Sequence, residues 1–243
     1  MSSFEDKNRL TTFSLFGYKD LSKIWAFLHM GRGPYLFNKV PGLIFYKLLG
    51  SGAGLGFSLK PDFGRYGFMA VWEQESCFLN FLQSDIYKSY LKHSYEQYHI
   101  KLCPFYSKGT WSGKNPFVYE SNIVSPEEPI VVLTRASIYP GKIREFWKYV
   151  PQTSESLKEA KGLIASIGVG EAPVYKQATL SIWKDQEAIK NYAYKMQSHK
   201  EVVQLTRMRN WYKEELFARF TIIDSSGTWN GKNPLEKIQT GNL

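Results

Sequence analysis

Two nine-residue segments of this chain are nearly identical, and this repeat constrains the fold more than any other feature. The segment from Gly109 reads Gly-Thr-Trp-Ser-Gly-Lys-Asn-Pro-Phe, and the segment from Gly227 reads Gly-Thr-Trp-Asn-Gly-Lys-Asn-Pro-Leu. A match of this length does not arise from composition, so the sequence predicts an internal duplication with a step of 118 residues. That step is too long for a solenoid, whose repeats span about 20–50 residues.

Further matches extend the alignment outward from the two segments. Each copy contains an apolar strand that ends in Trp (Gly67–Trp72 and Ala178–Trp183), followed by a long helical stretch and an aromatic strand. Each copy also opens with a strand and a helix, and a Gly-Leu-Ile triplet at Gly42 and at Gly162 starts the next strand. Each copy therefore reads strand, helix, strand, strand, helix, strand, which is the order of the ferredoxin-like unit.

A ferredoxin-like sheet carries its helices on one face, so its other face must be buried by something else. Two copies in one chain can bury these faces against each other. The sequence therefore predicts an α+β fold in which tandem ferredoxin-like (βαββαβ) units close a dimeric-α/β-barrel-like fold of about eight strands within one chain. We place the repeats at residues 1–118 and 130–236, with a connector at 119–129 and a tail at 237–243.

Composition narrows the classes of protein that are possible. There is no apolar run of about 18 residues and the N-terminus is polar, so we expect neither a membrane span nor a secretory signal. Cys77 and Cys103 lack metal-ligand spacing and suit a reducing compartment, so the cytoplasm is expected. The net charge is +9. Because the basic residues are scattered, nucleic acid is disfavoured, and an anionic membrane surface or an acidic redox partner fits better.

Two features have more than one interpretation. The 16 Phe, 16 Tyr and 7 Trp could fill the packing layers of a barrel or line a large apolar pocket for a flat or long ligand. The segment Gly50–Gly56 has Gly at every second position but lacks the spacing of a phosphate-binding loop. We expect a flexible connection at the barrel mouth, which could act as a lid.

A residue that serves a binding site, unlike one needed for the fold, can occur in one repeat only. His199 has no counterpart in the first repeat. It lies 16 residues after Trp183, whereas the position 16 residues after Trp72 holds a lysine. Ser198 and Glu201 form the Ser-x-x-Glu pattern of a capping box, which predicts that a helix begins here. The positive end of a helix would keep this imidazole neutral and able to ligate the iron of a flat cofactor. The alternative is an ordinary exposed histidine at a helix start.

The chain resembles the spheroidene monooxygenase family, the haem-dependent acyclic carotenoid 2-ketolases. The likeness runs from Phe13 to Leu235 and is strongest in six segments, Val40–Leu43, Gly50–Phe57, Leu133–Ala136, Ile167–Glu171, Leu180–Trp183 and Trp211–Phe220. The two Gly-Thr-Trp segments also match the family. In this resemblance the family's histidine falls on His199, and a family arginine falls on Arg207.

The resemblance implies a haem b-dependent monooxygenase that inserts oxygen from O2 into an apolar substrate such as an acyclic carotenoid. His199 would be the axial ligand of the iron, with Val203 on the same helix face and Arg207 paired with a haem propionate. Arg135 and Arg219, each on a predicted strand, could instead point into the barrel and meet a carboxylate or a propionate. Electrons would come from an external ferredoxin-type donor, because no flavin or nicotinamide motif is visible.

Two other classes stay open from the sequence. One is a different haem enzyme on the same barrel, an aldoxime-dehydratase-like lyase that needs no electron donor. The other is a haem-free barrel that binds a small apolar molecule, with His199 incidental. A carotenoid is too long for the interior of a 28.1 kDa barrel. A carotenoid substrate therefore predicts a pocket that opens beside exposed apolar residues with Lys or Arg at its rim, in a protein that visits an anionic bilayer surface.

Overall fold

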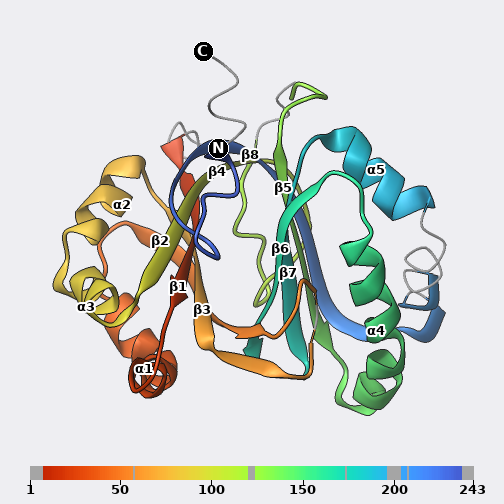
Figure 1. Ribbon diagram of the computed structural model, residues 1–243, viewed down its shortest axis with the longest axis horizontal. Helices are drawn as coiled ribbons and strands as arrows, with labels where there is room; N and C mark the ends of the chain where they lie inside the picture. The colour runs from red at the N-terminus through yellow and green to blue at the C-terminus, as the bar shows by residue number, and fades with distance from the viewer. Residues whose placement is uncertain are drawn as a thin grey trace.

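Figure 1 shows the computed structural model of the protein, a closed barrel of eight strands with helices on two opposite sides. The structure describes residues 8–56, 58–119, 124–172, 174–195, 204–206 and 208–236. The first half contains β1 (Leu10–Gly17), α1 (Ser22–Phe37), β2 (Leu43–Gly52), β3 (Pro61–Trp72), α2 (Glu75–Leu82), α3 (Asp85–His93) and β4 (Glu96–Gly109). The second half contains β5 (Ile130–Ile138), η2 (Pro140–Lys142), α4 (Ile143–Lys158), β6 (Leu163–Ala172), β7 (Lys176–Trp183), α5 (Gln186–Lys195) and β8 (Tyr212–Gly227).

The strand order around the barrel is β1-β3-β2-β6-β7-β5-β8-β4, and neighbouring strands pair antiparallel. The halves join where β2 pairs with β6 and where β4 pairs with β8. The predicted eight-stranded α/β barrel within one chain is therefore confirmed. That the halves arose by duplication remains an inference from the repeated sequence.

One helical stretch differs from the prediction. The residues after Trp72 form two helices, α2 and α3, in place of one long helix. Ser84 causes the break, because its extended backbone and its side chain, which accepts a hydrogen bond from the Tyr87 backbone N–H, start a new helix there.

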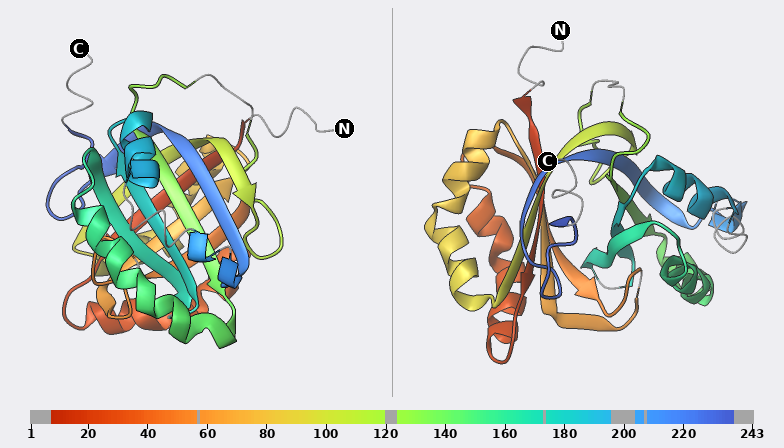
Figure 2. Two further views of the ribbon diagram at one scale, coloured as in Figure 1. Left: turned by 90° about the vertical axis from the view of Figure 1, so that its right-hand side faces the viewer. Right: turned by 45° about the horizontal axis from the view of Figure 1, so that its top comes forward.

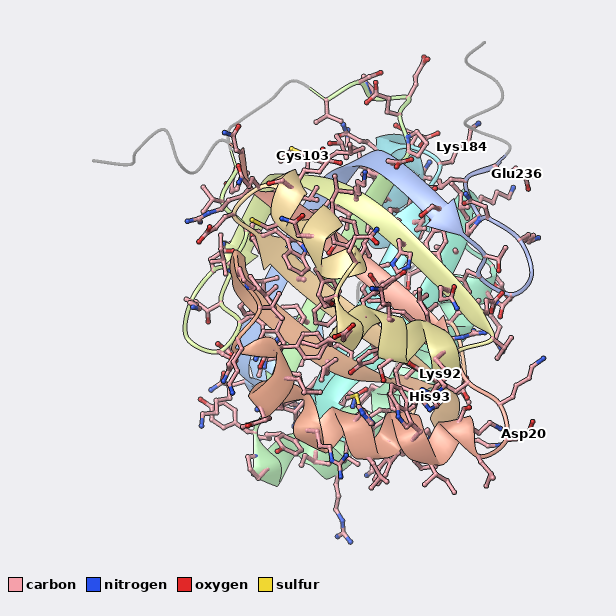
Figure 3. The ribbon with its side chains drawn as sticks, turned by 90° about the vertical axis from the view of Figure 1, so that its left-hand side faces the viewer. Asp20, Lys92, His93, Cys103, Lys184 and Glu236 are labelled. Atoms are coloured by element: carbon pink, nitrogen blue, oxygen red, sulfur yellow. The ribbon has the colours of Figure 1, made fainter. Side chains whose placement is uncertain are left out.

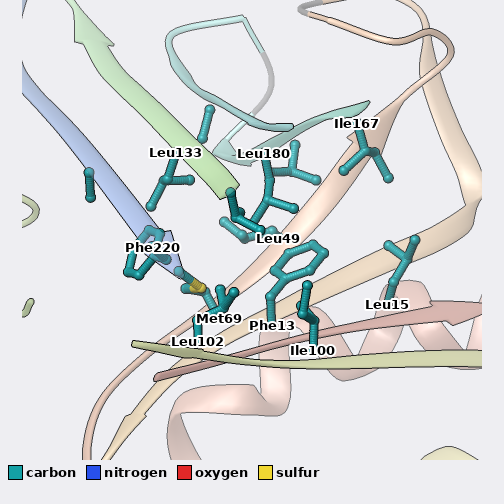
Figure 4. Packing of buried hydrophobic residues seen from close by; sticks show 14 of the residues in the cluster. Phe13, Leu15, Leu49, Met69, Ile100, Leu102, Leu133, Ile167, Leu180 and Phe220 are labelled. Carbon is teal, nitrogen blue, oxygen red and sulfur yellow. The ribbon is translucent and has the colours of Figure 1, made fainter. Parts of the chain in front are cut away.

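Apolar side chains fill the interior of the barrel. They point inward at every second position of the strands, as Figure 4 shows for Phe13, Leu15, Leu49, Met69, Ile100, Leu102, Leu133, Ile167, Leu180 and Phe220. Each of these is at most 3% exposed. The interior is thus a packed core shared by both sheets, which directs the search for a site to the outside of the barrel.

The two Gly-Thr-Trp segments fold in the same way at opposite ends of the β4–β8 pair. In each, the Trp pairs with the Lys three residues later, at Trp111 and at Trp229, and both indoles belong to the interior core. Gly109 (φ +97°) and Gly227 (φ +82°) start these turns, and a Cβ at either would lie 2.1 Å from a carbonyl oxygen of the facing strand. The repeated sequence therefore preserves a turn that only glycine can begin.

Candidate functional site

The outer faces of the two sheets carry different side chains at matching positions. The strand registers pair Leu10 with Trp72 in the first sheet and Ile130 with Trp183 in the second, which makes the two sheets directly comparable. On the first sheet five matching positions hold Phe16, Tyr46, Leu48, Tyr66 and Phe68. On the second sheet the same positions hold Ala136, Ser166, Gly168, Gln177 and Thr179. The second sheet thus has small or polar side chains where the first has large ones.

Among the described residues, the apolar packing of the second half forms two separate clusters. On the first sheet a single cluster joins the strands to α1, α2 and α3. On the second sheet one cluster lies around Trp183 and α5, and a separate cluster lies around Ile138, Phe146 and Trp211. We call the residues between them, Thr134, Ala136, Gly168 and Thr179, the central floor.

Burial differs across the central floor: Ala136 is 1% exposed and Gly168 is buried, whereas Thr179 is half-buried. Thr134 is exposed, whereas Ser14 at the matching position is 2% exposed. The helix α4 approaches the strands of its sheet less closely than α1 approaches β2 and β3. Figure 2 (left) shows α4 and α5 on the outer side of this sheet, towards its two ends. The floor therefore consists of small side chains between two apolar clusters, with its exposed edge at Thr134.

Arg219 borders the central floor, contrary to the prediction that it points into the barrel. Because Ala218 and Phe220 face the interior core, the residue between them must face outward. Its guanidinium lies 5.7 Å from the ring centre of Tyr106 and 5.2 Å from that of Phe217, which pairs with Thr134. Its Nε is buried and has no hydrogen-bond partner among the described residues. A half-buried cation with no ion pair to a described carboxylate favours an anionic group of a ligand.

Arg135 does point into the barrel, as predicted, and is 2% exposed. It donates hydrogen bonds to Glu214 and, at 3.2 Å, to Glu171, which also accepts one from the Trp111 indole at 2.7 Å. Burial raises the pKa of Glu214, but hydrogen bonds from the Gly113 backbone and Arg135 outweigh this and lower it to about 2. Two ionised protein carboxylates therefore supply the charge that this guanidinium requires. A role of Arg135 in cofactor binding stays a prediction.

His199, Val203 and Arg207 lie outside the described residues. The elements on either side of them belong to the outer face of the second sheet. The helix α5 packs on the Trp183 cluster, and Leu205 packs on the cluster of Ile138, Phe146 and Trp211.

The other three histidines lie on the first half. His29 and His93 stack on the Trp25 ring with centroid separations of 3.8 and 4.1 Å, and Figure 3 shows His93 among the helices of this side. His99 is held between the Tyr87 hydroxyl (2.7 Å) and the Ser14 hydroxyl (2.8 Å), and burial lowers its pKa to about 4. In the described part of the chain, no group of three or more His, Cys, Asp or Glu residues could hold a metal ion.

The glycine-rich connection between β2 and β3 reaches the second half. It crosses below the barrel in Figure 1, and the Leu55 carbonyl accepts a hydrogen bond from the Ser166 hydroxyl at 2.5 Å. Ser166 lies on the outer face of β6, two residues before Gly168 of the central floor. This places the connection beside the floor, and its action as a lid stays a prediction.

Comparison with known proteins shows to which family this chain is related. No protein-family model matches the chain. The spheroidene monooxygenase of Rhodobacter capsulatus is 36% identical over 229 residues, which cover 93% of this chain and 95% of the relative. The chain belongs to the spheroidene monooxygenase family. The enzymes of the same name from Cereibacter sphaeroides and Rubrivivax gelatinosus are 34% and 30% identical, over 94% and 87% of this chain and 71% and 81% of their own lengths.

The resemblance seen in the sequence is therefore confirmed. Among solved structures, an aldoxime dehydratase matches with a TM-score of 0.59 over 89% of this chain and 81% of its own, at 10% identity. That likeness shows a shared fold alone. Within the described residues, none of the helices has the length and apolar character needed to span a bilayer.

Sequence reasoning missed the central floor of this family member. Thr134, Ala136, Gly168 and Thr179 are common residue types, and none carries a motif. A signal was nevertheless present, because the repeat alignment sets them against bulky residues of the first copy. Comparing side-chain volumes between the repeats would have identified the positions where the second copy leaves space.

Proposed function

We propose that this protein is a monooxygenase that inserts oxygen from O2 into a carotenoid or a similar long apolar substrate. The observation that carries this proposal is family membership over nearly the whole length of the Rhodobacter capsulatus enzyme. The alternative of an aldoxime-dehydratase-like lyase has no support beyond a common barrel. From the cysteine usage we expect the protein to act in the cytoplasm.

We further propose that haem b is the cofactor and that it lies on the central floor. Two observations support the fit. Ala136, Gly168 and Thr179 have small side chains where the first sheet has Phe16, Leu48 and Phe68. Arg219, with its unpartnered Nε, could pair a propionate at the edge of that surface. Bound haem would supply the activation of O2.

The residues outside the described part of the chain have roles in this proposal. His199 would be the axial ligand of the iron, Val203 would contact the macrocycle, and Arg207 would be a second propionate partner. The apolar clusters on both sides of the floor would exclude water from the reacting carbon. A 2-ketolase-type reaction needs two successive oxidations of one carbon, so the substrate would have to stay bound between rounds.

Electrons would have to be delivered from outside, and a ferredoxin-type donor is proposed. Each oxidation round consumes one O2, two electrons and two protons, and releases one water. The net charge of +9 supports a partner with an acidic surface, because complementary charge accelerates encounter between redox proteins.

Absorption spectroscopy of the purified protein after haem supplementation tests this proposal. We expect the wild-type protein to bind one haem per chain and to show a Soret band. His199→Ala should lose that band with an unchanged far-UV circular dichroism spectrum, because the iron loses its axial ligand. His29→Ala is the matched control and should keep it, since His29 stacks on Trp25 of the first half. Stoichiometric haem with an unchanged spectrum in His199→Ala would falsify the assignment.

A further inference from the structure

The helix α1 has an apolar surface on the side that faces away from the barrel. Its buried residues Ala26, Gly33 and Phe37 face the first sheet. On the opposite side, five large apolar residues are between 56% and 79% exposed, namely Leu21, Ile24, Phe27, Leu28 and Tyr35. A helix that is apolar on its solvent side as well as its core side indicates a second apolar environment outside the protein.

Other exposed apolar residues lie at the start of β3 and in the connection before it. The Phe63 ring is 53% exposed and contacts the Phe27 ring at a centroid distance of 6.1 Å. Leu59 and Leu55 in the connection are 58% and 37% exposed. We call these residues, Leu21, Ile24, Phe27, Leu28, Tyr35, Leu55, Leu59 and Phe63, the apolar band.

The apolar band leads toward the candidate site. The carbonyl of Leu55, which belongs to the band, accepts a hydrogen bond from the Ser166 hydroxyl beside the central floor. In Figure 1 the connection runs beneath the barrel from the side of α1 to the side of α4. The band therefore connects an exposed helix of the first half with the outer face of the second sheet.

The charged residues within α1 are basic, and one acidic residue, Asp20, precedes the helix. The helix contains Lys23 and Arg32, both exposed, and has no acidic residue. Lys19 and Lys39 flank the helix, and the Lys39 ammonium lies 4.6 Å from the centre of the Tyr35 ring. Figure 3 shows α1 along the lower edge of the molecule, with Asp20 at its start. Neither Lys23 nor Arg32 forms an ion pair with a described residue.

We propose that the apolar band docks this protein on the surface of an anionic lipid bilayer. Large apolar side chains on one helix face, accompanied by Lys and Arg, are the features by which a helix lies in the membrane interface. The basic residues would contact anionic headgroups. The exposed Lys23 and Arg32 on the same helix complement anionic headgroups, and this charge complementarity favours the lipid as the occupant.

The purpose of this docking rests on the proposed function, because a long polyene substrate dissolves in the apolar interior of a bilayer. Docking through α1 would hold the connection at residues 53–60 against the membrane surface. A substrate could then pass along the band to the floor with only one end leaving the lipid.

Vesicle flotation tests the docking without catalysis, haem or carotenoid. We expect the wild-type protein to float with vesicles of equal parts phosphatidylcholine and phosphatidylglycerol, and to float weakly with phosphatidylcholine alone. Added salt should reduce the binding by screening the basic residues. Ile24→Asp should weaken binding to the mixed vesicles by roughly tenfold or more, since a large apolar contact is lost. Its helix should persist, because an acidic residue in the first turn stabilises a helix.

Ile223→Asp on β8 is the matched control, because Ile223 is 56% exposed and lies outside the band. It should float like the wild type. Equal flotation of Ile24→Asp and the wild type, or no binding of the wild type to the mixed vesicles, would overturn the proposal. A wild-type dimer that Ile24→Asp converts to a monomer in light scattering would show that a second copy occupies the band, and would overturn it also. A protein that floats as expected but binds no haem would refute the proposed cofactor and leave the docking intact.

Discussion

The outer faces of the two sheets have the same strand order and opposite packing. On the first sheet, aromatic and aliphatic side chains join the strands to three helices in one apolar cluster. On the second sheet, the matching positions hold Ala, Ser, Gly, Gln and Thr, and the apolar packing among the described residues forms two clusters. The comparison teaches that two repeats can keep one strand order while the side-chain volume on their outer faces differs.

The inner faces differ much less than the outer ones. Both sheets contribute to one interior, so an empty position in either would leave a cavity in the shared core. The helices that cover each outer face, in contrast, belong to the same half as that face. Some inward positions do differ, because Arg135 stands where the first sheet has Leu15, and Lys47 stands where the second sheet has Ile167. Arg135 pairs with Glu171 and with Glu214, and the first half has Glu96 at the position of Glu214.

A bulky side chain placed on the central floor should have the largest effect on haem binding. We expect Thr179→Phe to abolish haem binding and oxygenation, because the new ring would occupy the surface on which we propose the cofactor lies. The fold should survive, since the first sheet carries Phe68 at the same position. Thr179→Val, which adds no ring, is the control and should retain the Soret band. A haem titration of both variants would decide, and full haem binding by Thr179→Phe would remove the floor from the proposal.

Removing a large side chain from the outer face of the first sheet should lower the stability of the protein and leave haem binding unchanged. We expect Phe68→Thr to lower the free energy of unfolding by about 3–5 kcal/mol, because Phe68 is 3% exposed and its loss leaves a cavity in the sealed face. Urea unfolding followed by tryptophan fluorescence measures this change. Haem bound per folded molecule should equal that of the wild type, and a loss of haem binding would mean that the two faces are not independent.

His99 allows a smaller, pH-dependent test of the packing on the outer face of the first sheet. Burial lowers its folded pKa to about 4 from an ordinary value of 6.5, so the unfolded chain takes up the proton first. Stability should therefore be fully present above pH 6.5 and fall as the pH decreases from 6.5 toward 4. His99→Phe, which installs the Phe217 counterpart, should flatten this decrease while costing about 1–3 kcal/mol at pH 7, because Tyr87 and Ser14 lose their partner.

Urea unfolding at several pH values measures the effect of His99→Phe. His29→Phe is the control, because His29 stacks on Trp25 and does not bridge two strands and a helix. If the free energy of unfolding of His99→Phe still falls between pH 6.5 and 4 as in the wild type, other titratable groups cause the decrease.

The amino-acid sequence by itself determined the repeat, the order of the elements, the closed barrel and the family. These follow from local periodicity and from matches between segments, which do not depend on how distant strands meet. The sequence also indicated that Arg135 could point inward, but the same suggestion for Arg219 was wrong. Side-chain direction alternates along a strand, so a shift of one residue reverses it, and β8 contains small and polar residues on both faces.

The tertiary structure alone decided which small side chains lie together. Thr134, Gly168 and Thr179 come from three strands, and only the pairing registers of β5, β6 and β7 make them neighbours. The apolar band likewise became visible only when burial separated the two sides of α1, because the helix carries apolar residues on both. Sequence patterns report what a segment prefers, whereas a vacant volume and an exposed face depend on which other segments pack beside it.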